Sequence, residues 1–233
     1  LVGDTATLEV SDLLPGNHDV QATYNRNGDL ARSSSATLTH GVELADTSVT
    51  LESSNPDAVA GEPLTFSAQV SVVAPGAGQP TGTVQFAADG EPIGAPVAVS
   101  NGVAVSPATG LDAGDHVITA NYSGDNRFAG GSAMIDQEVE SARTTTAVTT
   151  SPNPSVVGQP VTVTATVSPV SPATGTPEGA IRFTIDGAVV GIVDLVDGEA
   201  EIEVGTLERG NHEVKAQYLS GDANFRPSTS TTA

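Results

Sequence analysis

Apolar and polar residues alternate along short stretches of this chain, and turn residues separate the stretches. In residues 44–141 the alternation predicts seven strands, near 47–52, 63–71, 82–88, 95–100, 103–108, 115–122 and 132–140. Dipeptides that favour a positive φ lie between predicted strands: Asp89-Gly90, Asn101-Gly102, Asp186-Gly187 and Asp197-Gly198. The pattern therefore predicts an all-β chain of antiparallel strands joined by tight hairpin turns.

One short stretch occurs three times along the chain. Residues 13–24 read LLPGNHDVQATY, residues 111–122 read LDAGDHVITANY and residues 207–218 read LERGNHEVKAQY. The closing tyrosines are 98 and 96 residues apart, which fits one small β-sandwich and exceeds the ~20 to 50 residues of a solenoid repeat. We therefore expect tandem antiparallel β-sandwiches of about seven strands each. Their predicted bounds are 1–43 for the C-terminal half of an incomplete repeat, expected to supply the last three strands of a sandwich, 44–141 for a complete repeat, and 142–233 for a repeat truncated in its last strand.

The third copy carries the most specific motifs. It runs from TTT at 144–146 through SPNPS at 151–155 and GQPV at 158–161 to YLSGDANF at 218–225. The second copy repeats the last motif as YSGDNRF at 122–128, whereas the first departs from it. These residues resemble the bacterial immunoglobulin-like repeats that occur in tandem in secreted and surface-anchored bacterial proteins and in some phage proteins. The resemblance implies a stalk or adhesive module, secreted or on a cell surface, with a virion surface as the alternative, and no catalytic residues.

Composition narrows the classes of partner. The formal net charge is −20, from eight basic and 28 acidic residues, so the surface repels nucleic-acid phosphates and anionic lipids. The chain has no cysteine, which rules out disulfides and thiolate metal sites. Its longest apolar runs, such as 188–193, are far shorter than the ~20 residues that span a bilayer. We expect neither nucleic-acid binding nor membrane insertion.

Histidine and tyrosine recur at fixed positions of the repeat. Three of the four histidines follow a turn glycine by two residues, and we predict that their imidazoles bond upstream backbone, as the tyrosine of a tyrosine corner does. Each tyrosine lies six residues further on and so shares the inward face of the strand. The residues assigned structural roles are His18, His116, His212, Tyr24, Tyr122, Tyr218, Phe86 and Phe183.

Acidic residues at the ends of the repeats raise the alternative of a calcium ion between neighbouring repeats, because carboxylate oxygens are preferred Ca²⁺ ligands. The candidates are Asp57, Asp89, Asp112 and Asp115 on the second repeat, facing Asp197 and Asp222 on the third. No EF-hand loop is present, so solvated turn carboxylates are the simpler interpretation, and no other cofactor is expected. Neither a G-x-S-x-G motif nor a recurring acid in a pocket-forming context occurs, which predicts a protein that is not an enzyme.

Two functions remain open from the sequence. The first is a structural spacer or stalk, whose partners are the neighbouring repeats of a longer chain. The alternative is a recognition module that binds a glycan or a protein through loops or through an edge strand, such as the open sheet edge expected of the incomplete first repeat.

Overall fold

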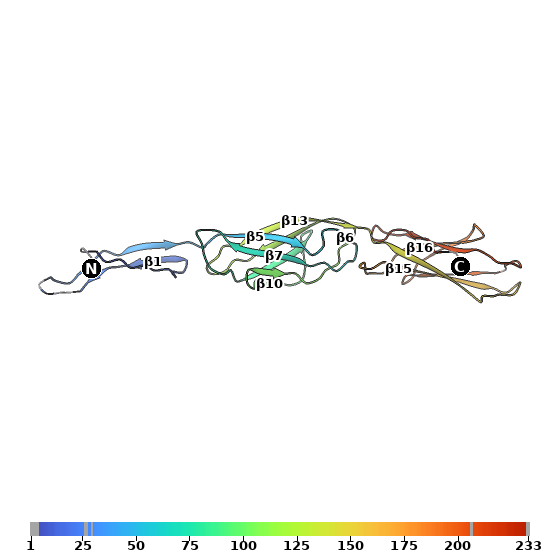
Figure 1. Ribbon diagram of the computed structural model, residues 1–233, viewed down its shortest axis with the longest axis horizontal. Helices are drawn as coiled ribbons and strands as arrows, with labels where there is room; N and C mark the ends of the chain where they lie inside the picture. Colours follow the sequence, from blue (N-terminus) through green and yellow to red (C-terminus); the bar gives the residue numbers. More distant parts are fainter. Residues whose placement is uncertain (1–4, 26–27, 29, 206, 232–233) are drawn as a thin grey trace.

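The computed structural model describes residues 5–25, 28, 30–205 and 207–231. Within these residues every regular element is a β-strand. The three repeats follow one another end to end and form an elongated rod, with the first repeat at one end and the third at the other (Figure 1). A search of the described residues for a helix able to cross a bilayer finds none.

The second repeat is a sandwich of two sheets. One sheet has the order β11 (Val103–Val105), β7 (Phe66–Val72) and β5 (Thr47–Ser53). The other has the order β10 (Val97–Ala98), β8 (Thr83–Ala88), β12 (Gly114–Tyr122), β13 (Gly131–Glu140) and β6 (Ala58–Val59), with β9 (Glu91–Pro92) also paired to β8. All these pairs are antiparallel except β13 with β6, so the chain crosses from one sheet to the other between β5 and β6.

The described part of the third repeat is also a sandwich of two sheets, with three strands in each. One sheet contains β14 (Thr144–Ser151), β15 (Val161–Pro169) and β18 (Glu199–Val204). The other contains β17 (Ala188–Asp194), β16 (Gly179–Ile185) and β19 (Val214–Ser220). The backbone N–H of Tyr218 donates to the Ser228 carbonyl at 2.8 Å, so residues after 227 begin to pair with β19.

Alternation along the strands produces the core of each sandwich. Phe86 and Phe183 are fully buried, Tyr218 is fully buried, and Tyr122 is 4% exposed. Phe66, Phe128 and Phe225 are also buried, and valine, isoleucine, leucine and alanine supply the rest, so each core depends on a few rings. The hairpin prediction is confirmed, because Asp89, Asn101, Asp186 and Asp197 all adopt φ values of 50–52°.

The seven strands predicted for the second repeat are all present, with shifted ends. The strand expected at 95–100 is the shortest, Val97–Ala98, because Pro96 has no N–H to extend the ladder. The two-residue strands β6 and β9 were not predicted, since two residues are too few for alternation to register.

The first repeat is a hairpin without a covering sheet. β1 (Gly16–Val20) pairs with β4 (Leu38–Val42), and β2 (Thr23–Tyr24) pairs with β3 (Ser33–Ser34). The expectation of three sandwich strands is not met: residues 6–15 form no strand. Their counterpart in the second repeat, β11, is held by β7, and no described strand of residues 5–43 pairs with residues 6–15 in this way. None of its described residues is buried.

Candidate functional site

The junction between the second and third repeats is the most elaborate site on the described chain. Strand β13 ends at Glu140 and β14 begins at Thr144, so three residues link the sandwiches. The middle residue, Ala142, is fully buried, and its N–H donates to the Asn224 carbonyl at 2.7 Å. The linker is therefore part of the packed structure of the third repeat.

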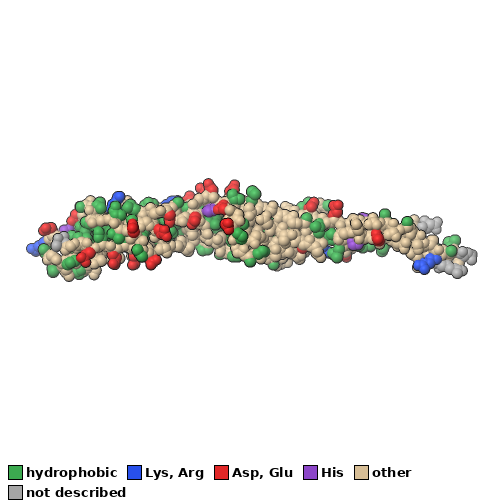
Figure 2. All heavy atoms as spheres, turned by 180° about the vertical axis from the view of Figure 1, so that it is seen from behind, with side chains coloured by type: hydrophobic (Ala, Val, Ile, Leu, Met, Phe, Trp, Pro, Cys, Tyr) green, Lys and Arg blue, Asp and Glu red, His purple; other side chains and the backbone are tan. Residues whose placement is uncertain are grey.

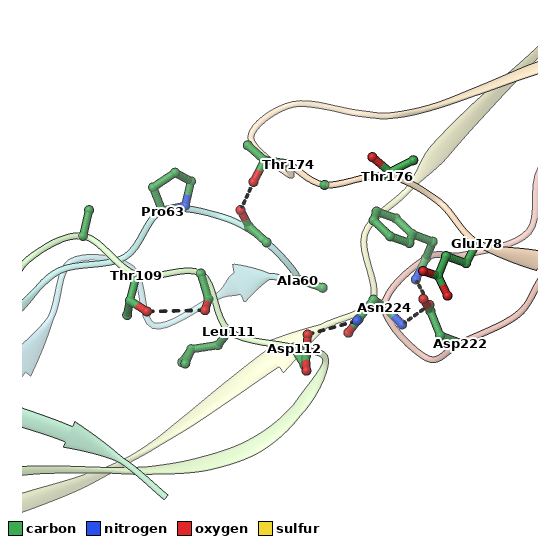
Figure 3. Close-up of a pocket in the computed structure, with 15 residues that line it drawn as sticks. Ala60, Pro63, Thr109, Leu111, Asp112, Thr174, Thr176, Glu178, Asp222 and Asn224 are labelled. Carbon is green, nitrogen blue, oxygen red and sulfur yellow. Dashed lines mark hydrogen bonds between the residues drawn. The ribbon is translucent and has the colours of Figure 1, made fainter. Parts of the chain in front are cut away.

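Asn224 connects the two sandwiches through its side chain (Figure 3). Its Oδ1 accepts a hydrogen bond from the backbone N–H of Ala113 at 2.7 Å, and its Nδ2 donates to Oδ1 of Asp112 at 3.0 Å. Both faces of one amide are thus engaged by the opposite repeat. This bidentate arrangement fixes orientation as well as distance.

Three further contacts cross or brace the junction. The Thr174 hydroxyl donates to the Gly61 carbonyl at 2.5 Å. Arg226 forms an ion pair with Glu140 at 2.8 Å, and the Ser141 hydroxyl donates to the Ala223 carbonyl at 2.7 Å. Ion pairs this exposed contribute little energy alone, so the neutral hydrogen bonds set the geometry.

Gly61 allows the two backbones to approach at the junction. Its φ is +73°, and a Cβ built there would collide with the carbonyl of Thr174. A side chain at this position is therefore excluded both by backbone conformation and by the neighbouring repeat.

An open cleft of about 670 Å³ lies at the junction, lined by residues of both repeats. Its acidic side chains are Asp112, Glu178 and Asp222 (Figure 3). Oδ1 of Asp222 accepts the backbone N–H groups of Asn224 at 2.8 Å and Phe225 at 3.3 Å. This carboxylate therefore shapes the loop that carries Asn224.

The six calcium candidates do not gather at one point. Asp112 and Asp222 line the cleft from opposite repeats, while Asp89 pairs with His116. Asp57, Asp115 and Asp197 are not among the residues that line it. Across residues 5–25, 28, 30–205 and 207–231, no group of three histidine, cysteine or acidic side chains is placed to hold a metal ion. Solvated turn carboxylates stay the simpler prediction for these residues, and a calcium ion stays the alternative.

Each histidine of the complete repeats closes a clip between a strand and a turn. Nδ1 of His116 lies 2.7 Å from Oδ2 of Asp89, and its Nε2 lies 2.9 Å from the Asp112 carbonyl. In the third repeat, His212 makes the same contacts with Asp186 at 2.6 Å and with the Glu208 carbonyl at 3.0 Å. Both ring nitrogens face acceptors, and only the doubly protonated imidazolium donates to both.

The charge of these clips shifts the pKa of both partners. Partial burial of His116 opposes its protonation, but the hydrogen bonds to Asp89 and to the Asp112 carbonyl outweigh burial and raise the pKa of the imidazole. The hydrogen bond to Asp186 is the main reason that the pKa of His212 is raised. The pKa of the Asp89 carboxyl is lowered, first by the N–H of Val117 and then by His116.

The first repeat has only half of the clip. Nε2 of His18 lies 2.6 Å from the Leu14 carbonyl, four residues upstream as in the other repeats. Among the described residues, Nδ1 of His18 has no carboxylate partner of the kind that Asp89 provides for His116. Tyr24 is half-buried there, in contrast to its buried counterparts.

The two buried tyrosines differ at the hydroxyl. The Tyr218 hydroxyl donates to the Glu178 carbonyl at 2.7 Å. The Tyr122 hydroxyl is buried and has no hydrogen-bond partner among the described residues. The loop after Tyr122 is one residue shorter than the loop after Tyr218, so the same end of the sandwich closes differently in the two repeats.

Sequence reasoning did not predict the residues that join the second and third repeats, which are Gly61, Thr174, Asn224 and Arg226. Asn224 and Asp112 are far apart in the sequence, and Asn224 does not recur at the equivalent position of the second repeat, which is Arg127. The recurrence of Asp89 and Asp186 at one repeat position was an available signal for the histidine clip.

Comparisons with known proteins return a family model and several solved structures. No curated protein matches the chain in sequence. The fibronectin(III)-like modules of Clostridium thermocellum CbhA are 21% identical, with a TM-score of 0.30, over 78% of this chain and 92% of that one. The Yersinia pseudotuberculosis adhesin InvE is 15% identical, with a TM-score of 0.39, over 79% of this chain and 58% of that one. Titin domains A168–A170 are 14% identical, with a TM-score of 0.28, over 94% of this chain and 74% of that one.

The family model of the bacterial Ig-like domain (group 3) matches the chain twice, over residues 50–140 and 148–233. These two matches cover most of the second and third repeats and lie in tandem, as the repeated motifs predict. The chain belongs to the bacterial Ig-like domain (group 3) family.

Proposed function

We propose that the chain is a structural spacer, a segment of a stalk that holds another part of its protein at a distance from a bacterial surface. The observation that carries this proposal is the junction around Asn224, where side chains from both repeats fix one sandwich on the next. A spacer needs such joints, because flexibly linked domains collapse toward the dimensions of a coil. The family's tandem arrangement supports the extracellular location, on a cell or alternatively on a virion.

The described surface supports a spacer over an enzyme or a glycan binder. The five phenylalanines and two of the three tyrosines are at most 7% exposed, which leaves no open aromatic platform for a sugar. Acidic side chains are scattered over the sandwiches, as Figure 2 shows, and repel other copies of the chain. In the junction cleft Asp222 accepts backbone N–H groups and Asp112 accepts the Asn224 amide, and the described lining residues include no nucleophile with an adjacent base.

Small-angle X-ray scattering of the 233-residue chain tests the proposal. Strands of up to ten residues make each repeat roughly 35 Å long, so the rod is roughly 100 Å long with a radius of gyration of about 30 Å. A compact domain of the same length has a radius of gyration of about 17 Å. A measured value near the compact figure overturns the spacer.

A recognition module remains the second candidate, and one observation favours it. The edge strand β17 exposes Val189, Val190 and Ile192 at 60%, 37% and 56%. Unpaired strand edges accept extended peptides by β-augmentation. Charge substitution of Ile192 separates the two functions, because it abolishes edge binding to a partner protein and leaves the scattering profile of a spacer unchanged.

A further inference from the structure

We infer that the two joints of this rod are mechanically different: the joint between the second and third repeats is locked, and the joint between the first and second is a hinge. The inference rests on the proposed spacer function and concerns its flexibility. It follows from which side chains occupy equivalent positions at the two joints.

The locking residues of the third repeat are replaced in the second. Alignment through Phe128 and Phe225 places Arg127 where the third repeat has Asn224, and Ala129 where it has Arg226. Arginine has no acceptor for a backbone N–H, and alanine forms no ion pair.

The same holds for the threonine that bonds Gly61. Alignment through Pro80 and Pro177 places Ala77 at the position of Thr174. Alanine has no hydroxyl, so the first joint lacks this hydrogen bond as well.

The residues that receive the lock are also replaced. Leu14 and Pro15 of the first repeat stand where the second repeat has Asp112 and Ala113. Leucine offers no carboxylate, and proline has no N–H to donate to an amide oxygen. In the linker, Leu44 stands where Ser141 braces the second joint.

The contacts agree with these substitutions. No hydrogen bond joins described residues of 5–43 to described residues of 44–231. The backbone N–H of Ala45 still donates to the Arg127 carbonyl at 2.9 Å, as Ala142 does to Asn224. The chain is therefore anchored to the second repeat from Ala45 onward, and the pivot lies at Glu43 and Leu44.

Pulsed electron–electron double resonance measures the two joints directly, because the chain has no cysteine and takes spin labels only where cysteines are introduced. Exposed Leu38, Thr50 and Thr149 lie on β4, β5 and β14. Labels at Leu38 and Thr50 span the first joint, and labels at Thr50 and Thr149 span the second. We expect a distance distribution at least twofold wider across the first joint.

Exchange of the joint residues tests the cause. Asn224→Arg with Thr174→Ala gives the second joint the residues of the first, and we expect its distribution to widen at least twofold. Thr176 lines the same cleft and makes no hydrogen bond among the described residues, so Thr176→Ala serves as the matched control. Equal widths at the two joints, or no widening in the double variant, overturn the inference.

A separate measurement tests whether an unpaired hairpin, and not the joint, broadens the distance distribution across the first joint. Val20 and Leu38 lie opposite each other in the β1–β4 ladder, so labels there show strong dipolar broadening in continuous-wave spectra while the hairpin is paired. Loss of that broadening assigns the width to the hairpin and overturns the hinge. A rod-like scattering profile together with equally wide distance distributions at the two joints contradicts only the hinge. A compact scattering profile contradicts the spacer function.

Discussion

The two buried tyrosine hydroxyls provide a matched pair for measuring one hydrogen bond. Tyr218 and Tyr122 occupy the same repeat position in their sandwiches, and both rings are buried. Only the Tyr218 hydroxyl has a partner, the Glu178 carbonyl at 2.7 Å. Replacing each by phenylalanine removes one oxygen and leaves the ring, so packing changes little.

The expected effects have opposite signs. Tyr218→Phe loses a hydrogen bond with a net contribution of about 1 kcal/mol, and the Glu178 carbonyl keeps the backbone N–H of Gly221 as a donor at 3.0 Å. Tyr122→Phe removes a buried hydroxyl that gains nothing from the fold, so the second repeat is unchanged or stabilised by up to about 1 kcal/mol.

Native-state amide hydrogen exchange on the full chain reports each repeat separately. We expect the slowest amides of β19 to exchange about fivefold faster in Tyr218→Phe, and those of β12 to exchange at the same rate or more slowly in Tyr122→Phe. Equal destabilisation by both substitutions refutes the reasoning, because it assigns the effect to the ring environment.

Three other predictions follow from the clips and the junction. The pKa values of His116 and His212 are raised, so the stability that these histidines contribute is complete below about pH 6.5 and is lost as pH rises through the raised pKa values. The pKa values of their aspartate partners are lowered, so the stability that the aspartates contribute is present above about pH 4 and is lost as pH falls below it. The urea midpoint is therefore highest between about pH 4 and 6.5, and asparagine at both histidines flattens the profile; an unchanged profile contradicts the clip. In isothermal calorimetry with Ca²⁺ at physiological salt we expect no saturable heat, because neither Asp112 nor Asp222 belongs to a group of three described side chains placed to hold a metal ion. A saturable heat that Asp222→Asn abolishes contradicts this expectation. Gly61→Ala widens the distance distribution across the second joint, because its Cβ meets the Thr174 carbonyl; an unchanged width disproves close backbone packing.

The sandwich and its strands were predictable because their determinants are local. Alternation marked Thr83–Ala88 and Gly114–Tyr122, and the Asp89-Gly90 pair supplied the positive φ of its hairpin. Each signal recurs after one repeat length, so the second and third copies reinforced one another.

The joint and the clip were not predictable to the same depth. The Asn224 amide meets Asp112 only after both sandwiches have formed, and Arg127 at the equivalent position removes any recurrent signal. For His116, reasoning from the repeat pointed to upstream backbone and overlooked Asp89, because a hairpin turn already explained that aspartate. The first repeat was expected to keep three strands, but residues 6–15 have no partner strand to hold them.

The side chains that lock the second joint by hydrogen bonds are not core side chains: Thr174 and Asn224 are exposed or partly exposed, whereas Phe86 and Phe183 are fully buried. Duplication or exchange of a repeat by recombination therefore leaves every sandwich able to fold. The stiffness of each new joint then depends on the side chains of the two repeat ends that meet there. Selection is thereby free to set where the protein bends independently of how long it grows.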